Sequence, residues 1–515
     1  MNKKDISLLK NIDNEILLLS HTAAILGWDQ ETYMPQNSVE ERSSQLALLS
    51  ALIHEKLTSA SMASIFKEIK NFKDISFEKD IPENDRYFIR KIFNAYKKQS
   101  LLPVSLVKEI SKQASISQHT WAKAKEDNNY KLFMPELEKM ISLQKQKAEC
   151  YGYTETPYNA LLDDYEKGST VSQLDKIFFD VELRVKNLLD KILTSTGMPV
   201  DIGDSFLYGK FDADKQDAVG RKLLEWLGFD FNSARMDTSA HPFTTTLGFS
   251  DVRITTHYKE NYFPAGLYSI IHECGHALYE MGFSKELKGT SLSEGTSLGI
   301  HESQSRFWEN MVGRGKGFAK LFWPVFCSYF ADAGKNRTYK DFFMAVNKVK
   351  PSLVRINADE VTYNLHIIIR YRLEKLLVED NLSVADLPAA WNNLYKDLLG
   401  LTPDSDSTGV LQDIHWSMGA IGYFPTYLLG NLYAAQFMAT MEKETGNVDD
   451  LVEAGNFKII LDWLRNNIHK YGSLYTPDEL VQKVTGQPLD PSYFLNYLDK
   501  KYSGMDCAMD GRVSR

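Results

Sequence analysis

The sequence of 515 residues predicts a mainly α-helical protein with one small β-sheet, and three observations support this prediction. Leu, Lys, Glu, Ala and Ser recur at helical spacing from residue 1 to about residue 235. Residues 240–258 instead alternate β-branched side chains around a Gly-Phe-Ser-Asp turn, as the strands of a hairpin do. Helical spacing then returns and continues into the C-terminal region.

The chain is expected to form one large domain, 1–515. No Pro/Gly/Ser-rich linker, fixed-period repeat or low-complexity block divides it. The change of composition predicts a helical N-terminal subdomain, 1–235, and a second subdomain, 236–515, which carries the motifs described below. In the first of these, LGWDQETYMP (26–35) is expected to be the end of a helix that packs Trp28 and Tyr33 into the core.

Charge and cysteine content exclude several classes of protein. The net charge of −9 is spread along the chain, which argues against nucleic acid or an anionic membrane as the main partner. No stretch approaches the length of apolar chain that spans a bilayer, and Asp5 and Asp13 interrupt any signal-peptide core. The four cysteines lack the spacing of a disulfide framework, so we expect a cytoplasmic protein.

The next predicted helix runs from Pro264 to Gly282 and contains HECGH (272–276). His272 and His276 are one turn apart, so both imidazoles can reach a single ion. Glu273 then projects beside that ion. The H-E-x-x-H pattern is typical of zinc hydrolases, in which two histidines bind the metal and the glutamate takes a proton from the attacking water. Gly275 would allow another backbone or a substrate to come close.

A catalytic zinc site needs a third protein ligand, and the sequence offers it in a second predicted helix, 291–313. Glu302 is the first choice there, with His301 and Glu294 as competitors. His301 and Glu302 point about 100° apart on a helix and cannot both face the ion.

The segment 240–258, which precedes the helix that contains HECGH (the metal helix), also suits a hydrolase of peptides. The free edge of a strand there could hold an extended peptide by main-chain hydrogen bonds. Arg253 lies on the same strand face as Asp251, so an ion pair between the two is favoured over direct contact of Arg253 with a substrate.

Six separated motifs together resemble the M32 family of metallocarboxypeptidases. They are HPF (241–243), DVRIT (251–255), HECGH (272–276), HESQ (301–304), RINAD (355–359) and GVLQDIHW (409–416). The resemblance implies a large helical peptidase of the gluzincin type with a deep groove and a small sheet beside the HExxH helix. It implies His272, His276 and Glu302 as metal ligands and Glu273 as the general base.

One position departs from the wider gluzincin pattern. Many of those enzymes place an aspartate four residues after the ligand glutamate, where it orients a metal-bound histidine, but residue 306 here is arginine. The group that orients the histidines must therefore come from elsewhere.

The remaining candidates would contact the substrate. We assign oxyanion stabilisation to His415 of QDIHW and to Tyr423, with Tyr427 as a substitute that also contacts substrate. Asp413 could orient His415 only in a non-helical loop. Arg355 is the first choice to bind a substrate carboxylate, against an alternative ion pair with Asp359, and Arg253 and Arg370 are reserves. His241 and Gln304, in their motifs, are further substrate-binding candidates.

The function that the resemblance implies is release of single C-terminal residues from peptides by one Zn2+ per chain, for which Co2+ could substitute. It also implies broad specificity, poor action on C-terminal proline, and a homodimer. Two alternatives stay open: an oligopeptidase or dipeptidyl carboxypeptidase with the same metal chemistry, and a helical peptide-binding scaffold without catalysis.

Overall fold

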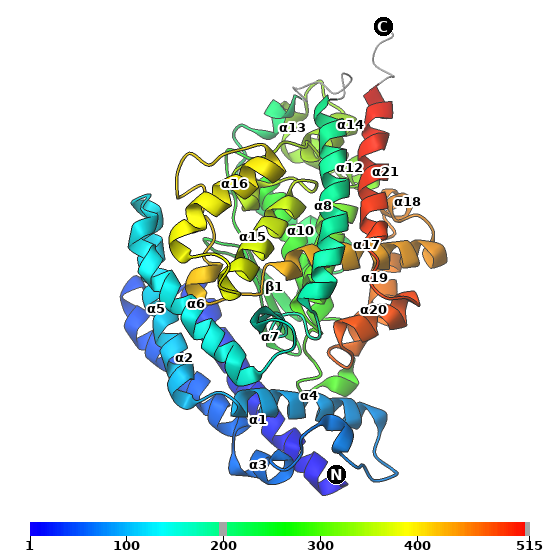
Figure 1. Cartoon of the computed structure of the whole chain (residues 1–515). Coiled ribbons are helices and arrows are strands. Elements are labelled where there is room, and N and C mark those ends of the chain that lie inside the picture. Colours follow the sequence, from blue (N-terminus) through cyan, green and yellow to red (C-terminus); the bar gives the residue numbers. More distant parts are fainter. Residues whose placement is uncertain (195–202, 510–515) are drawn as a thin grey trace.

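Helices build most of the fold, and the computed structural model describes residues 1–194 and 203–509, with side chains in the last helix as far as residue 503. One sheet of three strands lies among the helices (Figure 1). The expected mainly α-helical fold with a small sheet is thereby confirmed. The two ends of the described chain lie far apart, with the N-terminus in the lower lobe of Figure 1 and the last helix at the top.

The first helices form the lower lobe of the molecule in Figure 1. They are α1 (Lys3–Thr32), α2 (Val39–Leu57), α3 (Ala60–Phe66) and α4 (Glu83–Ser100). Their apolar side chains make a small core of their own, which includes Ile6, Phe66 and Phe88. Leu287 and Leu292 of the following chain complete that core, so the lobe docks directly onto the segment between the two helices of the site described below.

The remaining helices share one larger core, which begins well before residue 235. Ala124, Phe133 and Leu137 already belong to it. The core therefore divides nearer residue 100 than the expected residue 235. The helices of this part that precede the sheet are α5 (Val104–Glu126), α6 (Tyr130–Tyr151), α7 (Pro157–Leu162), α8 (Val171–Thr194) and α9 (Ala213–Leu227).

The helices after the site complete the larger core. They are α12 (Lys316–Tyr329), α13 (Ala331–Gly334), α14 (Tyr339–Val346), α15 (Tyr363–Val378), α16 (Leu387–Leu399), α17 (Pro425–Thr445), α18 (Val448–Glu453), α19 (Phe457–Asn467), α20 (Pro477–Thr485) and α21 (Ser492–Met509).

The sheet consists of β1 (Ala234–Thr238), β2 (Thr244–Gly248) and β3 (Asp251–Thr256) in the order β1-β3-β2. β2 and β3 form the expected antiparallel hairpin, while β1 pairs with β3 in parallel. The strand directly before the metal helix is therefore central, and the free edge that we expected there belongs to β2 instead.

The two faces of β3 contact different helices, because side chains alternate along a strand. Val252 and Ile254 are buried toward the larger core. Arg253 points the other way, where its guanidinium lies over the indole of Trp28 from α1 at 4.6 Å. Trp28 is buried as expected, but Tyr33 is 62% exposed, so its predicted place in the core is wrong: α1 ends at Thr32, and the Tyr33 hydroxyl donates to Asp237 at the surface.

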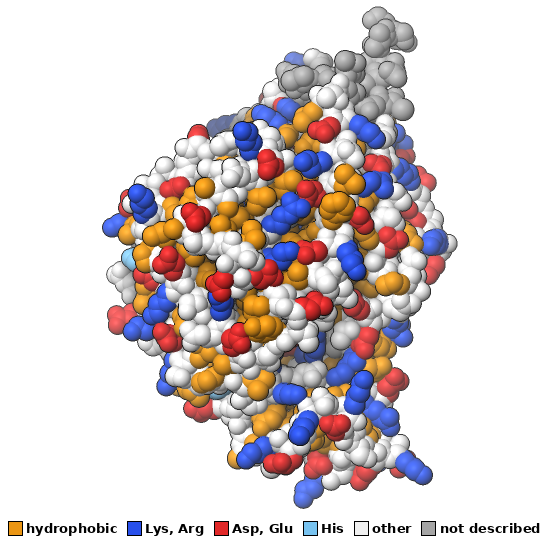
Figure 2. All heavy atoms as spheres, in the orientation of Figure 1, with side chains coloured by type: hydrophobic (Ala, Val, Ile, Leu, Met, Phe, Trp, Pro, Cys, Tyr) orange, Lys and Arg blue, Asp and Glu red, His pale blue; other side chains and the backbone are white. Residues whose placement is uncertain are grey.

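Acidic and basic side chains are interspersed over the face of the molecule that Figure 2 shows, which agrees with the even spread of charge in the sequence. Among the helices of the described ranges, none has the length and apolar character needed to cross a bilayer.

The helix that carries HECGH is α10 (Phe263–Glu280), with Pro264 in its first turn. The next one, α11 (Leu298–Arg306), begins seven residues later than the expected start at residue 291. The earlier residues form turns, and Ser297 caps the helix because its hydroxyl accepts a hydrogen bond from Ile300 N. The chain then continues as a π-helical turn, Phe307–Val312.

Candidate active site

Two imidazoles project side by side from α10, while the apolar residues of this helix are buried. Leu267, Ile271 and Cys274 face the core. His272 and His276 keep part of their surface exposed, and their rings lie 4.9 Å apart.

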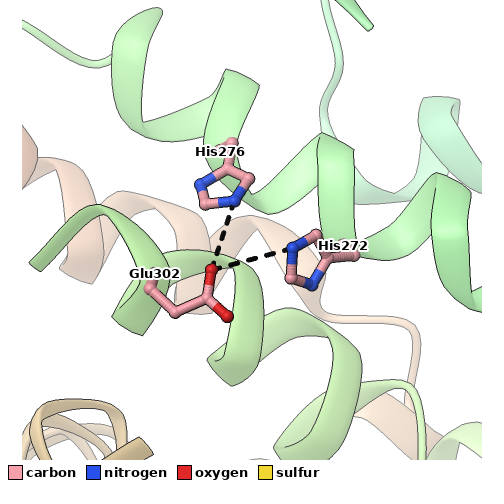
Figure 3. Close-up of side chains that lie close together, drawn as sticks. All are labelled: His272, His276 and Glu302. Carbon is pink, nitrogen blue, oxygen red and sulfur yellow. Dashed lines mark ion pairs between the residues drawn. The ribbon is translucent and has the colours of Figure 1, made fainter. Parts of the chain in front are cut away.

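Glu302 of α11 closes the group. Its Oε2 lies 3.8 Å from Nε2 of His272 and 3.5 Å from Nε2 of His276 (Figure 3). One ligand atom from each of these residues falls within 4.8 Å of the others, the only such group of three among the residues described. Ligands at about 2.1 Å from a tetrahedral zinc ion stand about 3.4 Å apart, which is close to the two separations from Glu302, so the chemistry and spacing of this donor set fit such an ion.

α11 packs closely between α10 and α17, at a glycine of each helix. A methyl group on Gly275 of α10 would lie 2.6 Å from Ser305 Cα, and one on Gly430 of α17 would lie 2.7 Å from Glu302 Cγ. Only glycine permits either contact. The expectation that Gly275 admits another backbone is confirmed, and that backbone is the helix of Glu302.

The carboxyl group of Glu273 lies beside the ligands and is held by the sheet. Thr244 Oγ1 of β2 donates to Glu273 Oε2 at 2.6 Å. The side chain is buried, and burial raises the pKa of Glu273 above its ordinary value. One of its oxygens remains for a water molecule or a leaving amine.

Glu309, on the π-helical turn, supplies the carboxylate that the sequence did not reveal. His272 Nδ1 lies 2.9 Å from Glu309 Oε2, so the ring donates there and turns Nε2 toward Glu302. Arg306, the unexpected residue, donates from Nε to Glu302 Oε1 at 2.6 Å. Glu302 can therefore offer only its other oxygen to an ion. Seven residues separate Glu302 from Glu309, which is two turns along one helical face, and that spacing was the available signal.

His276 is held by a second chain of contacts. Its Nδ1 lies 2.6 Å from Nδ1 of His301, and His301 Nε2 lies 2.8 Å from Oε1 of Glu280. With Nε2 of His276 facing Glu302, its Nδ1 carries the hydrogen and donates to His301, which donates in turn to Glu280. His301 is thus behind His276 and not a rival ligand. Residues 272, 276 and 280 recur every four positions, which would have indicated Glu280.

The charges of this cluster favour a cation between its members. Although burial acts in the opposite direction, the carboxylates of Glu302 and Glu309 raise the pKa of His272 to about 9. Burial likewise opposes the effect of Arg306 and His272, which together hold the pKa of Glu302 well below its usual range. The negative charges that favour a proton on His272 would also attract a metal ion to this place.

His415 and two tyrosines lie together on the loop and helix that follow residue 409. His415 Nε2 is 3.2 Å from the Tyr427 hydroxyl, and the ring centres of His415 and Tyr423 are 5.3 Å apart. Burial lowers the pKa of His415 to about 4, so the ring is neutral at neutral pH. Its Nδ1 is buried and has no hydrogen-bond partner among the described residues.

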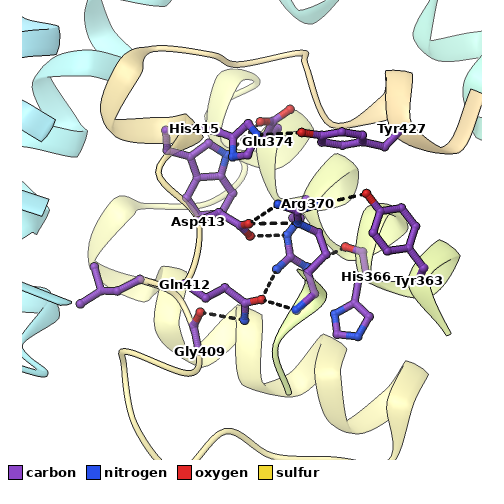
Figure 4. A network of polar contacts seen from close by, with 12 residues as sticks. Tyr363, His366, Arg370, Glu374, Gly409, Gln412, Asp413, His415 and Tyr427 are labelled. Atoms are coloured by element: carbon purple, nitrogen blue, oxygen red, sulfur yellow. Dashed lines mark hydrogen bonds and ion pairs between the residues drawn. The ribbon is translucent and has the colours of Figure 1, made fainter. Parts of the chain in front are cut away.

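Arg355 and Arg370 share one carboxylate, that of Asp413. Figure 4 shows Arg370 beside Asp413 in this network. Arg355 donates to Asp413 Oδ1 through Nε and Nη2, and Arg370 Nε donates to Oδ2 at 2.7 Å. The alternative pairing of Arg355 with Asp359 is therefore wrong, because Asp359 instead accepts from the backbone at the start of α15. Arg370 is wholly buried, which removes it as a reserve for substrate binding.

The loop that carries Asp413 is non-helical at that residue, as an orienting role for His415 would require. Its carboxylate is nevertheless occupied by the two arginines, and no hydrogen bond to His415 is formed among the described contacts. Asp413 therefore acts on His415 through charge alone.

The three remaining candidates for contact with a substrate are Gln304, Arg253 and His241. Gln304 is 1% exposed, and its amide oxygen lies 2.9 Å from His469 Nε2, so its contact with a substrate stays a prediction. Arg253 pairs with Asp251 at 2.8 Å, as favoured from the sequence. His241 is exposed just before β2.

The chain matches a family model described as Carboxypeptidase Taq (M32) metallopeptidase over residues 8–502. It is 39% identical to thermostable carboxypeptidase 1 of Thermus thermophilus, over 96% of this chain and 98% of that protein. It is 38% identical to carboxypeptidase 1 of Bacillus subtilis, over 98% of both chains.

Solved structures are similar over the same extent. The M32 carboxypeptidase of Deinococcus radiodurans has a TM-score of 0.93 at 34% identity, covering 98% of this chain and 100% of that chain. The carboxypeptidase of Pyrococcus furiosus has a TM-score of 0.93 at 38% identity, covering 98% and 99% of the two chains.

Proposed function

Because the chain belongs to the M32 family of metallopeptidases and is a metallocarboxypeptidase, we propose that it releases single C-terminal residues from peptides with one Zn2+ bound by His272, His276 and Glu302. The observation that carries this proposal is the convergence of the three ligand atoms beside the buried carboxyl group of Glu273. A divalent ion there would acidify a water molecule and polarise the scissile carbonyl.

Glu273 would act as the general base. Its Oε2 accepts from Thr244, so Oε1 is the oxygen that would take a proton from the attacking water and pass it to the leaving amine. The raised pKa of this buried carboxyl group supports both steps, since burial makes the carboxylate a stronger base than an exposed glutamate.

His415 and Tyr423 would donate hydrogen bonds to the oxyanion, and Tyr427 would orient the ring of His415. A neutral His415 carries one ring hydrogen, and if Tyr427 donates to Nε2, the hydrogen is on the unpartnered Nδ1. A buried donor without a partner is costly, which supports a partner supplied by the substrate.

Arg355 would bind the substrate carboxylate. Arg355 and Arg370 together carry two positive charges against the single charge of Asp413, so the cluster keeps a net positive charge. Three of the five N–H groups of Arg355 are used by Asp413 and Tyr363, which leaves two for a ligand. His241, Arg253 and Tyr427 remain proposals for further contact with the peptide.

Several finer properties rest on the family likeness or the composition alone. We propose broad specificity, poor action on C-terminal proline, a homodimer, and replacement of zinc by Co2+ on the likeness to M32 enzymes. A cytoplasmic location is proposed from the cysteine content.

The experiment is a mass-spectrometric time course on an N-blocked peptide of about ten residues, with the zinc-loaded protein and Glu273→Gln in parallel. We expect a ladder that loses one C-terminal residue at a time and is absent with the variant. Products shortened by two residues or cut internally would replace the proposal with a dipeptidyl carboxypeptidase or an oligopeptidase. An active Glu273→Gln would remove Glu273 as the base.

A further inference from the structure

Strand β2 carries two hydroxyl groups that reach α10 at two separate points. Thr244 and Thr246 are two residues apart and therefore project from the same face of the strand. Thr244 Oγ1 donates to Glu273 Oε2 at 2.6 Å, and Thr246 Oγ1 donates to Glu280 Oε2 at 3.0 Å. Glu273 and Glu280 are two turns apart on α10 and therefore lie on the same face of the helix, toward β2.

Each hydroxyl leads to a different part of the metal site. Thr244 contacts the carboxyl group of Glu273 directly. Thr246 contacts Glu280, whose other oxygen lies 2.8 Å from His301 Nε2, and His301 lies in turn against Nδ1 of His276. The contact of Thr244 holds the proposed base, Glu273. The contact of Thr246 holds the proposed metal ligand His276 through Glu280 and His301.

The main chain of the same two threonines faces the open edge of the sheet. Thr255 N of β3 donates to the carbonyl of Phe243 at 2.9 Å, and Phe243 N donates to Thr255 Oγ1 at 3.0 Å, so the main chain of Phe243 faces β3. In an antiparallel ladder the residues whose main chain faces the partner strand alternate, so Thr245 opposite Arg253 is the next one. The N–H and C=O groups of Thr244 and Thr246 therefore point away from β3.

We propose that Thr244 and Thr246 are positioning residues: their hydroxyls hold Glu273 and the Glu280–His301–His276 chain, while their main-chain groups receive the peptide. The positions of the base Glu273, of the ligand His276 and of the bound peptide then all depend on strand β2. Threonine suits this position because its β-branched side chain has few rotamers and keeps the hydroxyl aimed. The inference rests on the proposed role of Glu273 and adds two residues that the motifs do not include.

The test compares Thr244→Val and Thr246→Val, which remove only the hydroxyl, with Thr244→Ser and Thr246→Ser, which retain it. The matched control is Thr245→Val, since that side chain lies on the opposite face of β2. For each zinc-loaded protein the readouts are kcat and KM on one peptide and the affinity for Zn2+, measured by competition with a chromophoric chelator.

We expect Thr244→Val to lower kcat about 10- to 100-fold, with KM within about twofold and unchanged zinc affinity, because it loses one hydrogen bond to a charged group. We expect Thr246→Val to weaken zinc binding about tenfold and to recover kcat at saturating zinc. The serine variants should recover both properties, and Thr245→Val should resemble wild type.

Wild-type kcat in Thr244→Val, or an equal loss in Thr245→Val, would overturn the role of Thr244. Wild-type zinc affinity in Thr246→Val would overturn the role of Thr246. The Glu273→Gln variant shows whether the proposed function itself has failed. If that variant stays active, Glu273 is not the base and the role of Thr244 fails with it. The zinc affinity of Thr246→Val then still tests the role of Thr246.

Discussion

Glu309 Oε2 lies 2.9 Å from Nδ1 of His272, so a carboxylate on a π-helical turn orients the first histidine of the metal site. In Glu309→Gln the ring loses a charged acceptor and the site loses one negative charge, and both changes weaken its hold on a cation. We expect zinc affinity to fall about 10- to 100-fold, as measured by competition with a chelator.

A control for this variant is Glu453→Gln, whose exposed carboxylate pairs with Lys320 away from the site. It should bind zinc as wild type does. Unchanged affinity in Glu309→Gln would mean that the imidazole of His272 is oriented by the ion and its ligands alone.

Gly275→Ala should separate the two helices that carry the ligands. Its Cβ would lie 2.6 Å from Ser305 Cα and 2.7 Å from the carbonyl oxygen of Gln304, and backbone atoms cannot rotate away. We expect a loss of about 1–3 kcal/mol in unfolding free energy and weaker zinc binding.

The matched variant is Gly27→Ala, also within a helix, where a new methyl group meets nothing within 4 Å. It should stabilise the protein by about 0.5–1 kcal/mol, since alanine is the better helix former. Equal effects in denaturant unfolding would contradict the packing argument.

Glu374 should make stability depend on pH. Burial raises the pKa of Glu374 to about 7 from 4.5, although Tyr158, Gly422 and Trp416 all donate to it. A carboxyl group with a raised folded-state pKa stabilises the fold most below its unfolded pKa, and this contribution is lost as pH rises through the folded value.

The difference in unfolding free energy between wild type and Glu374→Gln should therefore fall by about 3 kcal/mol as pH rises from about 4.5 to about 7. Above that range it should be constant. Urea unfolding of both proteins across this range checks the prediction, and a difference that does not change with pH would show that Glu374 is ionised throughout.

Arg355→Lys should weaken recognition of the substrate carboxylate, because an ammonium group keeps the charge but not the fork of the guanidinium. We expect KM for peptides with a free C-terminus to rise about 10- to 100-fold, with a smaller change in kcat. Arg253→Lys is the comparison, since it makes the same change at the reserve candidate for this carboxylate, on strand β3. If Arg253→Lys instead raises KM and Arg355→Lys does not, the carboxylate is bound at the sheet.

The sequence predicted the fold and the metal helix because both depend on local spacing. Helical periodicity located α10, and four-residue spacing put His272 and His276 on one face. The predicted start of α11 was wrong because residues 291–297 form turns and carry only one apolar side chain, Leu292, whereas the cap at Ser297 fixes the start of the helix.

Local spacing could not predict contacts between segments that are distant in the sequence. Asp359 was the expected partner of Arg355 because it lies four residues away, but the structure pairs Arg355 with Asp413 across a loop. Gln304 was expected at the substrate because it belongs to a motif, and its burial against His469 depends on α19 and the turn after it. Likewise, no local pattern links Thr244 to Glu273.

The two glycine contacts also bear on the order of events during synthesis. All three proposed ligands are present once residue 302 has been made, yet the helix of Glu302 is held from its other side by Gly430 of α17. A nascent chain that ends before α17 would hold the donors without the support that fixes Glu302. We therefore expect a ribosome-bound chain to acquire its ion only after most of the C-terminal half has emerged and folded.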